Sequence, residues 1–290
     1  MLVVRLVGRK IYLAQILLYL FATIILLIQL FPVIWLISSS LKVGAKFWEV
    51  PFNPIPNPIS LDNYVQAFSA ATEEQMMGGH MGKAFVNSTI VTIIVVASQL
   101  WFCSLAGYSL ARFSFPGKEI VFYLILATIM IPPALLYIPL YEVVAKLKWF
   151  DTYQALVMPN LMAASTIFFM RQFLITVPQD LIDQARIDGS PELNTFVSII
   201  LPLAKPALAT LGIFAFVAAW NDFFWPLIVA ADWSHATVQV ALAKFAVINQ
   251  WVDMTKHTAA GVIAALPVMI AFIVFQRWIT QGIALTGLKY

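Results

Sequence analysis

Six apolar stretches divide this chain, and each is close to or above the length that crosses a bilayer. They cover approximately residues 13–38, 86–110, 119–141, 153–174, 203–230 and 259–281. An unpaired backbone polar group in lipid costs several kcal/mol, so such stretches must form helices or a closed barrel. Their length and uniform apolarity differ from the short alternating strands of a barrel. The sequence therefore predicts an all-α polytopic membrane protein with six transmembrane helices, in a single domain over residues 1–290.

Charge is sparse and scattered along the chain. Only 11% of the residues are charged, against about 25% in a typical soluble domain. The net charge of +3 comes from basic residues that form no cluster, which argues against nucleic-acid binding. Cys103 is the single cysteine and lies in an apolar stretch. An intrachain disulfide and a cysteine-based zinc site are therefore excluded, and lipid is the expected surrounding.

The distribution of lysine and arginine predicts the orientation in the membrane. With both termini in the cytoplasm, ten of the 17 basic residues fall inside and seven fall outside. This arrangement places residues 176–201 in the cytoplasm, and residues 41–83 and 232–258 on the outer side.

The only long polar segment between two apolar stretches runs from Val177 to Leu208. Pro178 suits the first turn of a helix, where a missing N–H is not needed, and Gly189 suits the end of one. Ser190 is a good N-cap for a second helix that begins at Pro191. The apolar residues of the first helix recur at helical spacing: Leu181, Ile182 and Ala185. The pattern predicts a short helix, a bend and a second helix that project into water.

Several motifs in and around this segment resemble ATP-binding-cassette (ABC) importer permeases. The signature loop of that family begins Glu-Ala-Ala and ends Ile-x-Leu-Pro, with a glycine between. The matching residues here are Asp183-Gln184-Ala185, Gly189, Ile199, Leu201 and Pro202. The opening triplet departs from the family pattern at Asp183 and Gln184. Four further motifs look like the sugar-importing branch, in particular the smaller permease of maltose-type transporters: Asn87-Ser88-Thr89, Ala106 to Phe113, Ile138 to Tyr141 and Trp220 to Phe223.

The resemblance implies a permease subunit that forms half of the pore of a carbohydrate importer in the bacterial inner membrane. It implies four kinds of partner: a second homologous permease, two ATPase subunits, an external solute-binding protein and membrane lipid. ATP and Mg would bind to the ATPase subunits, and this chain would carry no cofactor. The residues themselves predict no metal site, because the chain has one cysteine and its three histidines, His80, His235 and His257, are far apart.

The resemblance also gives roles to residues of the cytoplasmic coupling-helix loop at 176–201. A helix over Gln179 to Arg186 would sit in a groove of the ATPase and move as a rigid body. The expected ATPase-coupling residues are Leu181, Ile182 and Ala185 as the apolar contact, Asp183 as a charged contact, Arg186, and Gly189 as the turn.

No catalytic constellation is visible in the chain, and no GxxxxGK[ST] phosphate-binding loop. We therefore expect no enzymatic activity, and ATP hydrolysis on a separate polypeptide. The alternative is a secondary transporter driven by an ion gradient. A transporter of that class would have more carboxylates inside the membrane and two detectably repeated halves. Neither feature is evident in this sequence.

Four polar residues in or near the predicted spans are candidates for a translocation path: Asn87, Asn160, Asn221 and Asp222. A charge inside the membrane is costly and indicates function by default. Asp222 could equally satisfy backbone groups at a helix break, and the amides could equally form interhelical hydrogen bonds. Prolines interrupt the third to sixth spans, and kinked helices can open a cavity near the middle of the membrane.

The predicted outer segment at 232–258 joins the last two spans and contains Trp233 and Trp251. Tryptophans at a membrane interface usually form an aromatic belt. The resemblance adds a second role that is compatible with a belt, namely a docking surface for the solute-binding protein.

Overall fold

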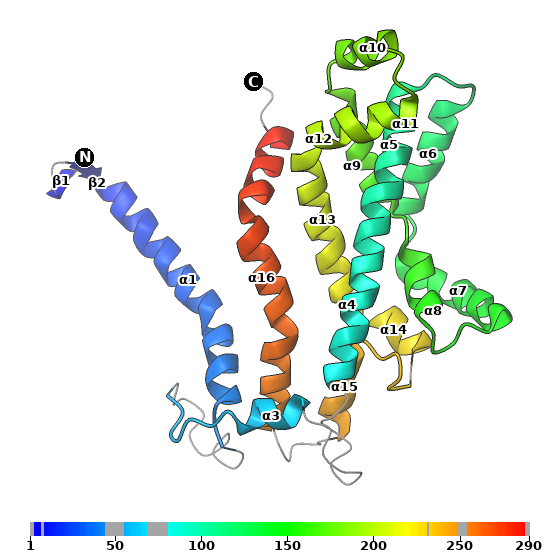
Figure 1. The fold of residues 1–290 in the computed structure, drawn as a ribbon. Helices are drawn as coiled ribbons and strands as arrows, with labels where there is room; N and C mark the ends of the chain where they lie inside the picture. Colours follow the sequence, from blue (N-terminus) through cyan, green and yellow to red (C-terminus); the bar gives the residue numbers. More distant parts are fainter. Residues whose placement is uncertain are drawn as a thin grey trace. The chain divides into compact units, whose positions relative to one another are not determined.

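The computed structural model describes residues 3–6, 9–43, 55–68, 81–230, 232–248 and 254–287. Figure 1 shows helices of very different lengths, many of them broken into shorter pieces. In chain order the elements are β1 Val3–Leu6, β2 Arg9–Tyr12, α1 Leu13–Ser40, α3 Asp62–Phe68, α4 Met81–Ser98, η2 Gln99–Cys103, α5 Ser104–Arg112, α6 Lys118–Ile129, α7 Pro133–Leu147, α8 Tyr153–Val157, η3 Met158–Asn160, α9 Ala164–Ile175, α10 Gln179–Ile187, α11 Glu192–Thr195, η4 Phe196–Ile200, α12 Leu201–Leu203, α13 Lys205–Trp220, α14 Phe224–Val229, α15 Val238–Ile248 and α16 Met254–Gly287. The antiparallel hairpin of β1 and β2 was not predicted.

Five continuous apolar segments and one bent pair supply the six predicted spans. The continuous segments are Gln15–Ser40, Met81–Arg112, Tyr153–Ile175, Lys205–Val229 and Met254–Gln276. The third predicted span, 119–141, is instead two helices, α6 and α7, with an angle of 100° between them. Pro132 and Pro133 lie at this break, because a proline removes the helical hydrogen bond that would continue α6. Pro267, by contrast, lies inside the unbroken α16.

Contacts divide the chain into two compact units, residues 1–79 with 245–263 and residues 80–244 with 264–290. The prediction of a single domain over 1–290 stays a prediction. In the first unit, Asn63 of α3 joins three segments. Its Nδ2 donates to the carbonyls of Ser40 and Lys42 at 2.8 and 2.7 Å, and its Oδ1 accepts from Thr255 Oγ1 at 3.3 Å.

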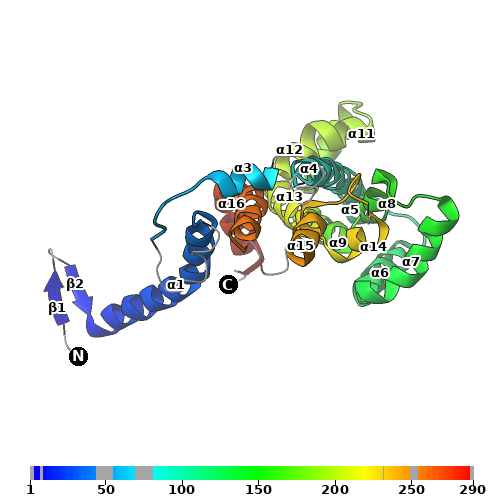
Figure 2. The same cartoon turned by 90° about the horizontal axis from the view of Figure 1, so that it is seen from below.

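The second unit is built around the close packing of α5 on α9. A Cβ on Gly107 would lie 2.8 Å from the Cβ of Met170, so only glycine permits this separation of the two helices. Figure 2 shows α5, α9 and α13 grouped together and α7 extending to one side. A buried apolar cluster continues from this contact into the polar segment, and it contains Tyr108, Met170, Leu174, Val177, Ile182, Phe196, Ile200, Ala204 and Leu211.

The helical run from Met81 to Arg112 gives the second unit two distinct ends. Asn87 and Arg112 are 25 residues apart (112 − 87) in this run, which corresponds to about 38 Å at 1.5 Å per residue. Asn87 bonds to the carbonyls of Ser234 and Ala236, whereas Arg112 bonds to Gln179. The segments at 176–201 and 232–237 therefore lie at opposite ends of this unit, separated by more than the roughly 30 Å hydrocarbon core of a bilayer.

Candidate functional site: a helical hairpin and a cavity

The polar segment folds as predicted into a short helix, α10, a bend and a second helix, α11 (Figure 1). Gly189 has φ +74° and forms the bend, in a region of backbone space that suits glycine. The predicted N-cap is wrong: Pro191 occupies the position before α11. The Ser190 hydroxyl instead accepts a hydrogen bond from the side chain of Asn194 at 2.8 Å.

The apolar face of α10 differs from the prediction, because part of it packs against the rest of the chain. Ile182 is fully buried and Ala185 is 5% exposed, and Ile182 belongs to the cluster around Tyr108. These two residues hold α10 against its own protein, which corrects their expected role as a contact with the ATPase. The apolar side chains that remain exposed on α10 are Leu181 at 36% and Ile187 at 85%. Ile187 was not predicted as a contact; it is the last residue of α10 and lies between Arg186 and Asp188.

Arg112, the last residue of α5, fixes the start of α10. Its guanidinium donates to the carbonyls of Leu174 and Val177 at the end of α9, and to Oε1 of Gln179 at 2.9 Å. The end of a helix leaves carbonyl groups without intrahelical donors and carries partial negative charge. A planar guanidinium matches such a set of acceptors better than an ammonium group does. Arg112 thus joins α5, α9 and α10 at one point.

A second polar contact joins the bend to the bundle. Glu192 accepts from Tyr108 Oη at 3.1 Å and from Arg186 Nε at 2.8 Å. Arg186 also lies 3.6 Å from Asp183, whose Oδ1 accepts from Gln179 Nε2 at 3.0 Å. These bonds link α10 and α11, which together form the helical hairpin, to α5. Asp183, predicted as a charged contact to a partner, keeps 51% of its side chain exposed.

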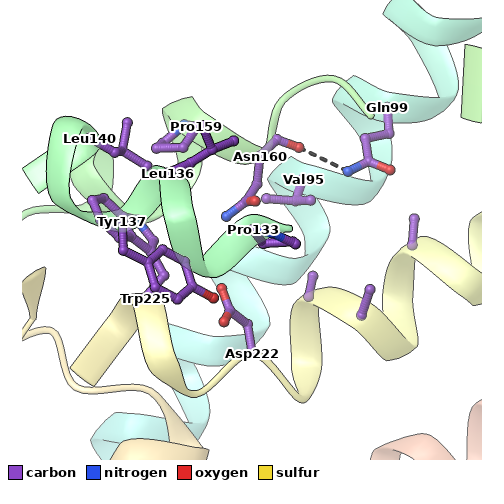
Figure 3. A pocket seen from close by; sticks show the side chains of 13 residues that line it. Val95, Gln99, Pro133, Leu136, Tyr137, Leu140, Pro159, Asn160, Asp222 and Trp225 are labelled. Carbon is purple, nitrogen blue, oxygen red and sulfur yellow. Dashed lines mark hydrogen bonds between the residues drawn. The ribbon is translucent and has the colours of Figure 1, made fainter. Parts of the chain in front are cut away.

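A cavity of about 320 Å³ lies at the helix breaks of the second unit, as the prolines predicted (Figure 3). Its lining residues come from α4, η2, α7, η3, α13 and α14 and from the turn between α13 and α14: Val95, Gln99, Pro133, Leu136, Tyr137, Leu140, Pro159, Asn160, Ala215, Ala218, Ala219, Asp222 and Trp225. Gln99 is 12 residues from Asn87 and 13 from Arg112 along the same helical run, about 18 and 20 Å respectively. The cavity therefore lies near the middle of this run.

Two of the four predicted path residues, Asn160 and Asp222, line this cavity. Figure 3 shows both side chains turned toward the space between them. Asp222 lies between α13 and α14, and it also accepts backbone hydrogen bonds from Phe223 and Trp225. Asp222 therefore satisfies backbone groups at a helix break and also faces the cavity, and its place on a translocation path stays a prediction.

The other two predicted path residues lie elsewhere. Asn87 is 1% exposed, and its side chain bonds to the carbonyls of Ser234 and Ala236 and to the Tyr153 hydroxyl. Asn87 therefore has the packing role that was its alternative. The exposed Asn221 accepts from Gln239 Nε2 at 3.2 Å, and it is not among the residues that line the cavity.

Gln99 is a cavity residue that the sequence did not single out. Its Nε2 donates to the Asn160 carbonyl at 2.9 Å, and its Oε1 accepts from Thr166 Oγ1 at 3.4 Å. Gln99 is 9% exposed and begins the π-helical segment η2. A glutamine in the middle of an apolar span was the available signal, because a polar group in that position needs bonding partners.

Part of the segment at 232–258, which was predicted to lie on the outer side, is described. Trp233 lies under the ammonium group of Lys244, which is 4.7 Å from the centre of the indole ring. The His235 ring packs edge-on against Tyr153, with 4.8 Å between centroids. Trp251 lies outside the described residues. The roles of belt and docking surface stay predictions.

Residues 103–285 match the family described as binding-protein-dependent transport system inner membrane component. The arabinooligosaccharides transport system permease protein AraQ of Halalkalibacterium halodurans is 34% identical, over 90% of this chain and 92% of its own. The protein of the same name from Bacillus subtilis is 33% identical, over 95% of this chain and 96% of its own. The sn-glycerol-3-phosphate transport system permease protein UgpE of Yersinia pestis is 28% identical, over 89% and 91%.

Among solved structures, a bacterial ABC transporter involved in the import of the acidic polysaccharide alginate contains a chain of similar fold. The TM-score is 0.78 at 23% sequence identity, covering 90% of this chain and 95% of that chain. This likeness confirms the predicted all-α permease fold.

Proposed function

The chain belongs to the family of binding-protein-dependent transport system inner membrane components, and on that premise we propose that it forms half of the pore of an ATP-driven carbohydrate importer. It is a multi-pass membrane protein and a transport permease, not an enzyme. Membership of this family favours ATP-driven import over the alternative of an ion-driven secondary transporter. The arabinooligosaccharide permeases, which are 34% and 33% identical over at least 90% of this chain, support a carbohydrate substrate.

The proposed assembly contains this permease, a second homologous permease, two ATPase subunits and an external solute-binding protein. ATP and Mg bind to the ATPase subunits, and this chain needs no cofactor of its own. Both termini and residues 176–201 face the cytoplasm, and residues 232–258 face the solute-binding protein.

One observation carries the coupling role: α10 is anchored on one side and uncovered on the other. Ile182 and Ala185 fix it to the bundle, while Leu181 and Ile187 remain exposed beside charged neighbours. An exposed isoleucine in a hairpin held by Arg112 and Glu192 suits a docking contact that moves as a unit with α5 and α9. Asp183 adds a charged contact to a basic residue of the ATPase.

Ile187→Asp tests this role. Burying an isoleucine at an interface contributes about 1.5–3 kcal/mol, so the change should weaken retention of the ATPase on the purified permease by at least tenfold. The matched control is Phe115→Asp, because Phe115 is 40% exposed and follows Arg112 in the turn between α5 and α6, outside the hairpin. Equal retention in both variants and in the unaltered protein would refute docking through α10.

A further inference from the structure

We infer that the cavity at the helix breaks is a subsite for one unit of an uncharged sugar, and that its carboxylate excludes anionic sugars. This inference rests on the proposed function and adds the charge class of the substrate. The substrates in the names of the relatives differ in charge, since arabinooligosaccharides are neutral whereas sn-glycerol-3-phosphate and alginate are acidic. The relatives therefore leave the choice between a neutral and an acidic substrate undecided, and the lining of the cavity supplies the information.

The size of the cavity suits a small polar ligand. Its volume of about 320 Å³ is at the lower end of the roughly 300–1,000 Å³ typical of small-molecule sites. Such sites combine mostly apolar walls with a few polar groups that fix the orientation of the ligand. Here the walls are largely aliphatic and aromatic, and the polar side chains that remain for a ligand come from Tyr137, Asn160 and Asp222. The polar atoms of Gln99 and Trp225 are already bonded within the protein.

An aromatic wall provides the surface for a sugar ring. Tyr137 stacks on Trp225 with 6.2 Å between centroids and an interplanar angle of 25°. Trp225 is 3% exposed, and its Nε1 donates to the Ala155 carbonyl at 2.8 Å, which fixes the indole in place. The C–H groups of a sugar ring are apolar and pack on an aromatic face, whereas its hydroxyls need acceptors at the ring edge. Asp222 and Asn160 provide such acceptors.

The charge of the lining selects among sugars. Asp222 is the only charged residue among those described as lining the cavity, and Lys, Arg and His are absent from that set. Like charges repel more strongly in a protein interior than in water, because the effective dielectric constant is lower. A carboxylate also makes stronger hydrogen bonds to hydroxyl donors than a neutral acceptor does. A neutral sugar gains these bonds, and an anionic sugar meets the repulsion.

A neutral sugar is favoured over a cationic one by the relatives, because the substrates named for the permeases that are 34% and 33% identical are neutral oligosaccharides. The Asp222 carboxylate accepts from the backbone N–H groups of Phe223 and Trp225, which hold it in place at the edge of the cavity.

The test measures occupancy of the cavity directly, because a solute-binding protein would impose its own selectivity on uptake. Ala218 lines the cavity and is exposed, so Ala218→Cys in a Cys103→Ala background gives a thiol at the site. The purified complex without solute-binding protein is treated with N-ethylmaleimide in the presence of arabinotriose, trigalacturonate or the trimer of glucosamine. Phe214→Cys is the control, because Phe214 is 54% exposed on α13 but is not among the lining residues.

Arabinotriose should protect the thiol of the Ala218→Cys variant and leave that of the Phe214→Cys control reactive. Trigalacturonate should need at least tenfold higher concentration for the same protection. Asp222→Asn keeps an acceptor for the two backbone N–H groups and removes the charge, so the difference should shrink to about twofold.

Four results would each overturn the inference: equal protection by the acidic sugar, an unchanged difference in Asp222→Asn, better protection by the glucosamine trimer, or no protection by any sugar. Retention of the ATPase on α10 is measured separately, so a failure here leaves the proposed coupling role intact.

Discussion

At the residue scale, Arg112 is the side chain on which the hairpin depends most. It bonds to two carbonyls at the end of α9 and to Gln179 at the start of α10, so it holds three helices with one planar group. Arg112→Lys keeps the positive charge but removes the planar guanidinium group that bonds to all three acceptors. Each lost hydrogen bond to a charged group should lower the free energy of unfolding by roughly 1.5–3 kcal/mol. We expect lower thermal stability, with uptake reduced more than ATP hydrolysis.

Arg186→Lys is the matched control for that variant. The pair of Arg186 and Glu192 is 2.8 Å apart, but both side chains are more than 40% exposed. An exposed pair of this kind contributes only about 0.2–1 kcal/mol. Thermal unfolding and uptake should therefore be impaired in Arg112→Lys and nearly unchanged in Arg186→Lys. Equal unfolding temperatures and equal uptake in the two variants would contradict the role of Arg112.

Residue roles were the least predictable part of this chain. The sequence identifies Asn87 as a polar residue in a span, but its partners Ser234 and Ala236 are 147 and 149 positions away. Only the folded chain shows that Asn87 is satisfied and that Asn160 and Asp222 face a cavity. Periodicity placed Ile182 and Ala185 on one face of α10, but it could not tell whether that face meets a partner or the same protein.

At the scale of elements, the bend at Gly189 depends on backbone conformation and not on available space. Its φ is +74°, and a Cβ there would meet no atom within 4 Å. Gly189→Val should therefore cost about 1–3 kcal/mol through backbone strain alone, displace α11 from α10 and severely reduce uptake. Gly189→Asn should be milder, because asparagine tolerates left-handed backbone. Uptake and stimulated ATP hydrolysis are the measurements, and equal activity of both variants would exclude the bend from coupling.

The elements themselves were largely predictable, because apolar length determines spans and some prolines mark breaks, although Pro267 lies inside an unbroken helix. The bounds of α1, predicted at 13–38 and observed at Leu13–Ser40, illustrate the first rule. The break before Pro133 illustrates the second. The angle of 100° between α6 and α7 was not predictable, since it depends on how each helix packs after the break. The π-helical segments η2 and η4 also carry no local signal in hydropathy.

At the scale of the whole molecule, we expect the two ends of the second unit to face opposite sides of the membrane. The helical run from Asn87 to Arg112 is longer than the hydrocarbon core is thick. This length separates the segments at 176–201 and 232–237, and the bias in basic residues predicts which of the two is cytoplasmic. The two inferences are independent, so one labelling experiment can test each of them.

The last prediction concerns that labelling. Cys103 is buried, and its Sγ donates to the Ala163 carbonyl at 3.7 Å and accepts from the Ala163 N–H at 3.4 Å. Cys103→Ala removes the only native thiol of this chain. In that background, Ile187→Cys and Asp232→Cys place single thiols on exposed residues at the two ends. An impermeant maleimide added to intact cells should label the Asp232→Cys variant and not the Ile187→Cys variant, and permeabilised cells should show labelling of both. Labelling of the Ile187→Cys variant alone from outside would reverse the orientation while preserving the fold. Labelling of both from outside would contradict the separation of the two ends, and with it the path of the 81–112 helix across the bilayer.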